Sequence, residues 1–411
     1  MNKTIELLAP AGNLNKLHTA LHFGADAVYC GAEGFSLRAQ AANMTLDQLE
    51  IALDRTHRAG KKLYLALNIF ANDADFETLP AYVDAVSALG VDALIVSDPG
   101  VIELCRTRAP KTELHLSTQA NTTNRYSAAF WAKQGVRRIV LARETKLEDI
   151  ARMRAYLPSD VGIEAFVHGA MCISYSGRCL LSNFLSGRES NRGDCVQACR
   201  WEYEIREHNR GGLPLTIGQE ARGTYLLNSK DLNMLPYLDR LVEAGADSLK
   251  IEGRMKSESY VAGAVHAYRT ALDAYLADPK GYRCDPTWLQ WTERISHRAY
   301  STGMYFADAD NVCADTSKPQ CDYTFVAQVI GYDAERGAAI AEQRNRFAVG
   351  DELTTLSADP SCDDKILSAK QMFDEQGAAV ADAYLVQQIL YIPTPYRLGR
   401  GDILMKKGTA K

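Results

Sequence analysis

The chain has 411 residues, which is too many for one ordinary domain and about right for two or three. A hydrophobic content of 46% is normal for a globular protein and allows sizeable cores. The formal net charge of −5 argues against a strongly basic nucleic-acid coat, although it leaves room for a local basic cleft. We find neither an apolar signal segment at the start nor an apolar run of about 18 residues, so we expect a soluble, cytoplasmic protein without a membrane span.

Residues 1–270 repeat one pattern, in which a short apolar run is followed by an amphipathic helix and then by a glycine. Three of the joints between a helix and the next apolar run are nearly identical. They read Gly24-Ala-Asp-Ala-Val-Tyr, Gly90-Val-Asp-Ala-Leu-Ile and Gly245-Ala-Asp-Ser-Leu-Lys. A glycine in this place ends a helix in the left-handed conformation, so we expect each β-strand to start a few residues later.

Eight apolar runs in this region predict eight strands, separated for the most part by amphipathic helices such as residues 46–59, 81–89 and 234–244. This alternation predicts a TIM-like parallel (β/α)8 barrel over residues 1–300, which need not be regular. The competing fold is an open doubly wound sheet, but no G-x-G-x-x-G follows the first strand, which disfavours a dinucleotide-binding form of it. We expect the strands at Glu6–Ala9, Ala27–Gly31, Lys62–Asn68, Ala93–Ser97, Glu113–Ser117, Arg138–Ala142, Gly162–Val167 and Ser248–Glu252.

The pattern changes after a linker, which we place at residues 301–320 because this stretch holds small and polar residues. Short β-like runs follow, and two of them are introduced by Gly-Asp, at Gly350-Asp351 and Gly401-Asp402. Such closely spaced turn signals predict a small β-barrel domain over residues 321–411. Its strands are expected at Phe325–Ile330, Ala338–Ala341, Glu352–Leu356, Ala383–Ile389 and Ile403–Met405.

Four of the ten cysteines lie in one segment, about residues 168–223, that interrupts the barrel pattern. Cys172 and Cys179 form a first close pair, and Cys195 and Cys199 form a second. Two close pairs joined by a short loop can bring four thiolates to one centre, and the glycines and alanines among them leave room for inorganic sulfide. The segment therefore predicts a [4Fe–4S] cluster. The alternatives are a structural zinc ion, whose four-cysteine sites usually have tighter C-x2-C spacing, and plain reduced cysteines.

Polar residues at the predicted strand ends are candidates for a substrate pocket, because barrels of this class carry their chemistry at that face. We take His168, Lys250 and Glu252 as catalytic candidates. Lys250 and Glu252 share one side of a strand, where buried charges need partners or a ligand; the alternative is a layer of salt bridges that closes the barrel. His168 is either an acid or base near the cluster or a donor to a backbone carbonyl. The candidates for binding substrate are Asn68, Gln119, Arg143, Arg178 and Arg254.

Motifs of several other enzyme classes are missing from the sequence. It contains no H-E-x-x-H, no G-x-S-x-G and no Walker-type G-x-x-x-x-G-K-[ST]. A hydrolase would therefore need an unusual site.

Several segments, in the same order, resemble the collagenase-like peptidase family U-32. The most specific stretch runs from Glu164-Ala-Phe-Val-His-Gly-Ala-Met-Cys to Ser-Gly-Arg-Cys-Leu-Leu-Ser. The resemblance covers roughly residues 5–300, and it implies a family-type β domain after them. The other segments are Leu7-Leu-Ala-Pro-Ala-Gly-Asn-Leu, Ser97-Asp-Pro-Gly, His115-Leu-Ser-Thr-Gln-Ala-Asn, Asn228-Ser-Lys-Asp-Leu and Leu249-Lys-Ile-Glu-Gly-Arg.

Within this family the chain is most similar to the branch that hydroxylates tRNA, chiefly through residues 193–203 with Cys195, Cys199 and Arg-Trp-Glu-Tyr. The resemblance implies conversion of the wobble uridine to 5-hydroxyuridine, in a reaction that requires prephenate and uses an iron–sulfur cluster. The anticodon arm of the tRNA would lie across the barrel mouth and the β domain. Lys250, Arg254 and Arg143 would bind the dicarboxylate metabolite. The cluster ligands would be Cys172, Cys179, Cys195 and Cys199.

Two other functions remain open on the residues alone. One is a metal-dependent or atypical peptidase, which the family label implies although the sequence offers no recognisable protease constellation. The other is a non-catalytic assembly protein that uses a structural metal to present the β domain.

Overall fold

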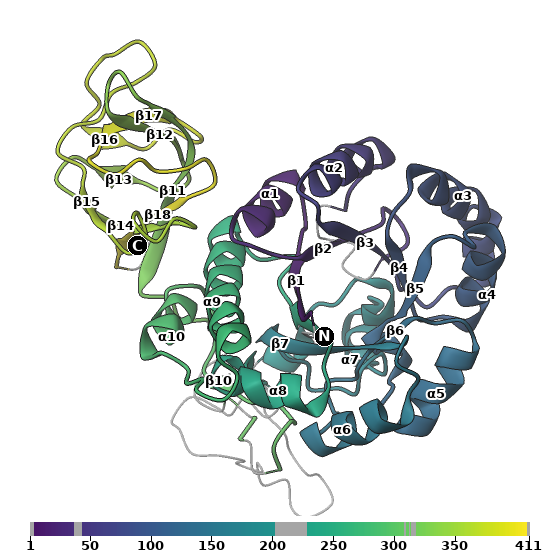
Figure 1. Ribbon diagram of the computed structural model, residues 1–411. Coiled ribbons are helices and arrows are strands. Elements are labelled where there is room, and N and C mark those ends of the chain that lie inside the picture. The colour runs from purple at the N-terminus through teal and green to yellow at the C-terminus, as the bar shows by residue number, and fades with distance from the viewer. Residues whose placement is uncertain are drawn as a thin grey trace, which may run out of the picture.

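The computed structural model describes residues 4–36, 43–201, 228–307, 310–311, 313 and 318–408. Eight parallel strands form a barrel: β1 (Glu6–Pro10), β2 (Ala27–Gly31), β3 (Lys62–Leu67), β4 (Ala93–Val96), β5 (Glu113–Leu116), β6 (Arg138–Val140), β7 (Gly162–Ala170) and β9 (Ser248–Ile251). The ring closes because β9 pairs with both β1 and β7. Figure 1 shows helices around this ring and a smaller β domain to one side of it. The predicted TIM-like barrel is confirmed.

The outer helices are α1 (Leu14–His22), α2 (Leu46–Arg58), α3 (Leu79–Leu89), α4 (Pro99–Arg108), α5 (Arg125–Lys133), α6 (Leu147–Tyr156), α8 (Leu238–Ala244) and α9 (Glu258–Ala277). Thr45 begins α2 with a capping box, since its hydroxyl accepts from the N–H of Gln48 at 3.3 Å and the Gln48 side chain accepts from the N–H of Thr45. Gly90 and Gly245 end α3 and α8 with φ angles of +79° and +108°, as the repeated joint predicts. Within the described ranges, no helix is both long and apolar enough to span a bilayer.

Two short strands extend the sheet beyond the closed ring. β8 (Asp231–Asn233) pairs antiparallel with the end of β7, and β10 (Tyr300–Ser301) pairs with β8. The helix expected at residues 234–244 begins later than predicted, at Leu238. A 3₁₀ turn at Leu235–Tyr237 precedes it, because Pro236 suits a first turn but not a helix interior.

The cysteine segment, which is described as far as residue 201, follows β7. It contains α7 (Leu181–Ser186) and two 3₁₀ turns, Ser190–Arg192 and Ala198–Arg200. Of its residues 172–201, Ala198 is the one apolar residue that is buried, so the described part of the segment has no hydrophobic core of its own. The rest of the predicted insertion, residues 202–223, and part of the predicted linker lie outside the described residues.

The β domain is a curled antiparallel sheet of six strands, in the order β15 (Ile366–Ser368), β14 (Glu352–Leu356), β18 (Ile403–Lys407), β11 (Tyr323–Asp333), β12 (Ala338–Gln343) and β17 (Ile389–Pro393). A further pair joins β13 (Phe347–Ala348) to β16 (Asp382–Ala383). The strand predicted at Ala383–Ile389 is wrong. Ala383 ends β16 and Ile389 begins β17, but the apolar residues between them, Tyr384, Leu385 and Val386, lie in an exposed turn, where Gln387 has a φ of +58°.

The β domain packs against the barrel helices through polar and apolar contacts. The Gln328 amide donates to the hydroxyl of Thr19 at 3.2 Å, and Nε2 of His22 lies 2.7 Å from the Asp402 carboxylate. Ile403 of β18 belongs to the same hydrophobic core as the barrel. Figure 1 shows the domain beside α9 and α10 (Pro286–Glu293).

Buried charges fill part of the barrel interior. Glu164 of β7 is fully buried; its carboxylate accepts a hydrogen bond from Nζ of Lys250 at 2.7 Å and lies 3.3 Å from Arg138. Arg138 also binds Glu6, whose carboxylate accepts from the Tyr64 hydroxyl at 2.6 Å. Burial opposes a charge on Glu164, but Lys250 and Arg138 outweigh it and hold the pKa of that carboxyl below its usual value. A layer of salt bridges thus fills the barrel, with Glu164 as the partner of Lys250.

We expect Glu164→Gln to lower the free energy of unfolding by about 3–5 kcal/mol, because it leaves two buried cations with one carboxylate fewer. Asp160→Asn is the matched control, since Asp160 pairs with Arg137 at 2.7 Å where both side chains are more than half exposed. Exposed pairs contribute about 0–1 kcal/mol. Urea denaturation at neutral pH measures both variants. Similar losses for the two would contradict a buried charge network.

Candidate functional site

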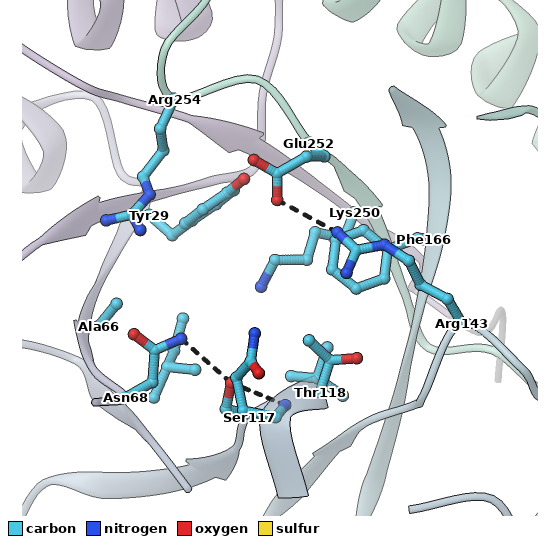
Figure 2. A pocket seen from close by; sticks show the side chains of 13 residues that line it. Tyr29, Ala66, Asn68, Ser117, Thr118, Arg143, Phe166, Lys250, Glu252 and Arg254 are labelled. Carbon is cyan, nitrogen blue, oxygen red and sulfur yellow. Dashed lines mark hydrogen bonds and ion pairs between the residues drawn. The ribbon is translucent and has the colours of Figure 1, made fainter. Parts of the chain in front are cut away.

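A small polar cavity of about 50 Å³ opens at the carboxyl ends of the barrel strands (Figure 2). We call it the inner cavity. Because parallel strands of a barrel end at the same rim, residues far apart in the sequence meet there. Six of the residues singled out in the sequence line it: Asn68, Gln119, Arg143, Lys250, Glu252 and Arg254.

Cations dominate one part of the inner cavity. Figure 2 shows Arg143 and Arg254 on opposite sides of it, with Lys250 pointing inward. The guanidinium of Arg143 lies 3.5 Å from the Glu252 carboxylate and 4.1 Å from the centre of the Phe166 ring. Three cations around so small a space favour an anionic ligand with carboxylate or phosphate groups.

The backbone around Arg254 is shaped by glycine. A Cβ on Gly31 would lie 2.2 Å from Nη1 of Arg254, far closer than two such atoms can approach. The same Nη1 donates to the Ser36 hydroxyl at 3.4 Å, and the Arg254 carbonyl accepts from Lys16 at 3.2 Å. Arg254 is therefore held by the segment after β2 and by α1.

The facing wall of the inner cavity is uncharged. The amide of Asn68 donates to the hydroxyl of Ser117 at 3.2 Å, and this hydroxyl also accepts from the N–H of Gln119 at 3.3 Å. Ser117 caps the 3₁₀ turn Thr118–Ala120, so the turn and the amide are positioned together. Amides and hydroxyls in this arrangement can donate to or accept from a polar ring.

A larger cavity of about 210 Å³, the outer cavity, adjoins the inner one. All four predicted cluster ligands line it: Cys172, Cys179, Cys195 and Cys199. Three residues line both cavities: Gln119, Arg143 and Glu252. Arg200 and Lys256 add positive charge to the outer cavity, where burial lowers the pKa of Lys256 and its Nζ donates to the Ser296 carbonyl at 3.1 Å.

The first cysteine pair is attached to the loops that follow β5 and β6. The N–H of Ser176 donates to the Glu144 carboxylate at 2.8 Å. At Gly177 the φ is +73°, and a Cβ would lie 2.3 Å from the carbonyl oxygen of Gln119. Glycine at this position allows the segment to lie directly on the barrel rim, next to the inner cavity.

The second cysteine pair is attached to the loop after β3. Arg192 binds the two carboxylate oxygens of Asp75 at 2.8 and 2.9 Å, and these hydrogen bonds hold the pKa of Asp75 below its usual value. Asn191 and Ser190 donate to the carbonyl of Cys179 at 3.0 and 3.1 Å. The two halves of the segment are therefore bonded to each other as well as to the barrel.

The cysteine thiols differ in how readily they ionise. Burial raises the pKa of Cys172, and it raises that of Cys199 to about 11, with a further rise at each from neighbouring cysteines. At Cys179 burial is outweighed by hydrogen bonds from Ser174 and from the start of α7, and the pKa lies below its usual value. Cys179 is thus closer to the thiolate form than Cys172 and Cys199.

The four thiols of the outer cavity suit a cofactor that contains several metal atoms. Four thiols line one space. Cys179 and Cys195 raise the pKa of Cys172, and all three other cysteines raise the pKa of Cys199. Among the described residues, however, no three Cys, His, Asp or Glu side chains are grouped closely enough to bind a single metal ion. These cysteines could hold an iron–sulfur cluster, whose thiolate ligands each bind a different iron.

Two predicted site residues line neither cavity. His168 is buried among Tyr260, Tyr268 and Tyr300, whose ring centres lie 5.5 to 5.8 Å from its own. In the described part of the chain neither ring nitrogen of His168 has a hydrogen-bond partner, so the bond to a backbone carbonyl, one of its two predicted roles, is not formed. Arg178 is exposed on the cysteine segment. We therefore leave His168 out of the proposed catalytic residues and Arg178 out of the proposed substrate-binding residues.

Comparison with known proteins points to one family. The model of peptidase family U32 matches residues 12–313, and the model of the U32 C-terminal domain matches residues 321–404. The chain belongs to peptidase family U32. The tRNA hydroxylation protein P1 of Bacillus subtilis is 38% identical over 99% of this chain and 96% of its own. The tRNA hydroxylation protein P of Escherichia coli is 34% identical over 96% and 94%, and a Collagenase of Porphyromonas gingivalis is 31% identical over 73% of each chain.

Two residues that hold the site of this U32 protein together escape prediction from one sequence, namely Asp75 and Arg192. Their pairing joins positions 117 residues apart. Asp75 also has a local explanation, because its carboxylate accepts from the N–H of Asn72 at 2.7 Å in a capping box. Paired changes at the two positions in an alignment are the signal that could find them.

The buried His168 makes stability depend on pH. Burial holds its pKa at about 3, against 6.5 in an unfolded chain. Between these values the unfolded state binds a proton that the folded state does not, so stability falls as the pH falls. One such proton changes the free energy of unfolding by about 1.4 kcal/mol per pH unit. We expect His168→Phe to reduce the slope of the unfolding free energy against pH by this amount between about pH 6 and pH 5. Urea denaturation at several pH values measures it.

At neutral pH the same variant should be as stable as the wild type or more so, because Phe leaves no unpaired ring nitrogen in the interior. If the free energy of unfolding changes with pH in the same way for both proteins, His168 is not held neutral by burial.

Proposed function

We propose that this U32 protein is a tRNA hydroxylase that converts the wobble uridine to 5-hydroxyuridine, with a [4Fe–4S] cluster and with prephenate as a required metabolite. Two relatives that match nearly the whole chain bear the name tRNA hydroxylation protein. The observation that carries the proposal is the meeting of two cavities at the barrel mouth. One is lined by four thiols and the other by cations, and Arg143 and Glu252 belong to both.

The proposed cluster ligands are Cys172, Cys179, Cys195 and Cys199. A zinc ion is the alternative, but its tetrahedral site would need the sulfurs within about 3.8 Å of one another. The ligands of a cluster stay further apart, because each binds a different iron, and metal analysis distinguishes the two. Arg143, Arg200 and Lys256 would balance the negative charge of the thiolates. When bound, such a cluster supplies one-electron redox chemistry.

The inner cavity is the proposed place for a carboxylate of prephenate. Its volume of about 50 Å³ lies far below the roughly 300–1,000 Å³ of pockets for whole drug-sized ligands. It therefore suits a charged head group, with the rest of the metabolite extending into the outer cavity. Arg254 and Arg143 offer guanidinium forks that match the two oxygens of a carboxylate. Lys250 adds a third charge and is held in place by Glu164 at 2.7 Å.

Glu252 is the proposed acceptor for the proton that leaves the uracil ring. Hydroxylation replaces the C–H bond at C5 by a C–O bond and removes two electrons from the base, so it needs a source of oxygen and a two-electron oxidant. The hydrogen of C5 leaves as a proton when both electrons pass to that oxidant. Glu252 lines both cavities and lies 3.5 Å from Arg143, where a carboxylate can reach a base held in the outer cavity. Gln119 also lines both cavities, and its amide can donate to and accept from the edge of a uracil.

Nucleoside analysis of tRNA tests this proposal. A strain that lacks the gene should lose 5-hydroxyuridine and its derivatives, and the gene on a plasmid should restore them. Unchanged nucleosides in that strain, together with degradation of gelatin by the homogeneous protein, would favour a peptidase, as the name of the Porphyromonas gingivalis relative suggests for that protein.

We expect Cys195→Ala to remove both the cluster and the modification, because one of four thiolates is lost. The matched control is Cys284→Ala, since Cys284 is also partly exposed but does not line the outer cavity. Iron and sulfide analysis of protein purified without oxygen should give about four irons per chain for the wild type and the control. Modification that persists in Cys195→Ala would rule out this ligand set, and one zinc per chain in the wild type would rule out the cluster.

We expect Arg254→Gln to weaken prephenate binding by roughly 10- to 100-fold, the effect of losing a charged hydrogen-bond donor to a carboxylate. Arg178→Gln is the control, because Arg178 is exposed and lines neither cavity. Calorimetric titration of the cluster-loaded protein with prephenate, in the absence of RNA, measures both. Equal affinities for the two variants would place the metabolite elsewhere.

A further inference from the structure

Exposed apolar side chains surround the outer cavity. Ile173, Tyr175 and Met255 line the cavity and are also exposed to solvent. Four more stand on the same cysteine segment. Leu180 and Trp201 adjoin lining residues in the sequence, and Phe184 and Leu185 lie on α7, whose first two residues line the cavity. We call these seven residues the apolar rim.

The exposure of the rim is costly for a protein that stands alone. Phe184 is 86% exposed and Tyr175 is 64% exposed, although burying a side chain of this size stabilises a protein by roughly 1.5–3 kcal/mol. Single apolar residues scattered over a surface are ordinary, but a group of them around one cavity marks a binding surface. The rim is therefore suited to a partner that covers it.

We propose that the apolar rim binds the unpaired bases of an RNA loop, with Tyr175, Phe184 and Trp201 as the rings on which these bases stack. This inference rests on the proposed function and names the part of the substrate that the protein recognises. Aromatic side chains bind splayed bases of single-stranded loops in this way. The outer cavity, with about 210 Å³, is also the proposed place of the cluster and of part of the metabolite, so it has no room for a stack of bases. The target base must leave its neighbours to enter it, and the neighbours then lie over the rim.

Charge at this face is compatible with RNA as its occupant. The cations that line the outer cavity, Arg143, Arg200 and Lys256, offset Glu252 and the thiolates of the proposed cluster, so the cavity does not repel a polyanion. Arg178 is exposed on the same segment, between two rim residues in the sequence, and adds a cation beside the rings. Rings next to cations suit a polyanion with unpaired bases.

Equilibrium binding of a fluorescent anticodon-arm transcript to the full-length protein tests the inference. Tyr175→Ala and Trp201→Ala should each weaken binding about tenfold, the effect of losing one stacked base. Tyr175→Phe should bind like the wild type, because stacking needs the ring and not the hydroxyl. The matched control is Tyr126→Ala, since Tyr126 is also 64% exposed but lies on α5 in the outer layer of the barrel. An unstructured RNA strand should compete with the transcript, and a blunt RNA duplex should not.

Wild-type affinity in both Tyr175→Ala and Trp201→Ala would overturn the inference, and loss of 5-hydroxyuridine in the deletion strain would still support the proposed function. A wild-type protein that binds no RNA would contradict that function itself. If sedimentation shows a wild-type dimer that Phe184→Ala dissociates without any change in RNA binding, the rim belongs to a second copy of the chain and the inference is wrong.

Discussion

The carboxylate of Glu164 has no access to water, and the site depends on how its charge is balanced. An eight-stranded barrel has an interior just wide enough for side chains, so a charge placed there must find its partners among the strands. Lys250 and Arg138 provide them from β9 and β6. Because Glu164 holds its ammonium at 2.7 Å, Lys250 has one well-defined position at the floor of the inner cavity. The buried ion pair thereby fixes how deep the cavity is, and it places the ammonium group of Lys250 at the floor.

Two parts of the chain with different physical character meet above that floor. The barrel contributes arginines and amides at strand ends that are set by backbone pairing. The cysteine segment contributes thiols, and it is joined to the barrel mainly by polar contacts such as those of Ser176 with Glu144 and of Arg192 with Asp75. Arg143 and Glu252 stand where the two parts join. The proposed reaction at this junction would use a charged metabolite from one side and a redox centre from the other.

The parts of this structure that follow from local signals could be predicted from the sequence. Glycine joints and apolar runs mark all eight barrel strands, and the barrel topology then brings Asn68, Gln119 and Arg254 together without further information. His168 lies away from both cavities, although side chains normally alternate along a strand and Phe166 does line the inner cavity. The pairing of β7 with β9 is irregular between Phe166 and His168, which breaks that alternation. Contacts such as Asp75 with Arg192 depend on side chains that meet after folding, and no local pattern encodes them.

The lack of buried apolar surface in the cysteine segment has a consequence for the order in which the protein is assembled. Of residues 172–201, Ala198 alone among the apolar residues is buried. Releasing such a segment from its hydrogen bonds costs less free energy than opening a barrel whose strands are covered by helices. A newly made chain can therefore have a finished barrel while its four thiols are still within reach of a carrier of the proposed cluster. On that proposal, binding of the cofactor would be the final step of maturation and would fix the segment in place. In chains without the cofactor, this segment would be the first place at which a cellular protease could cut.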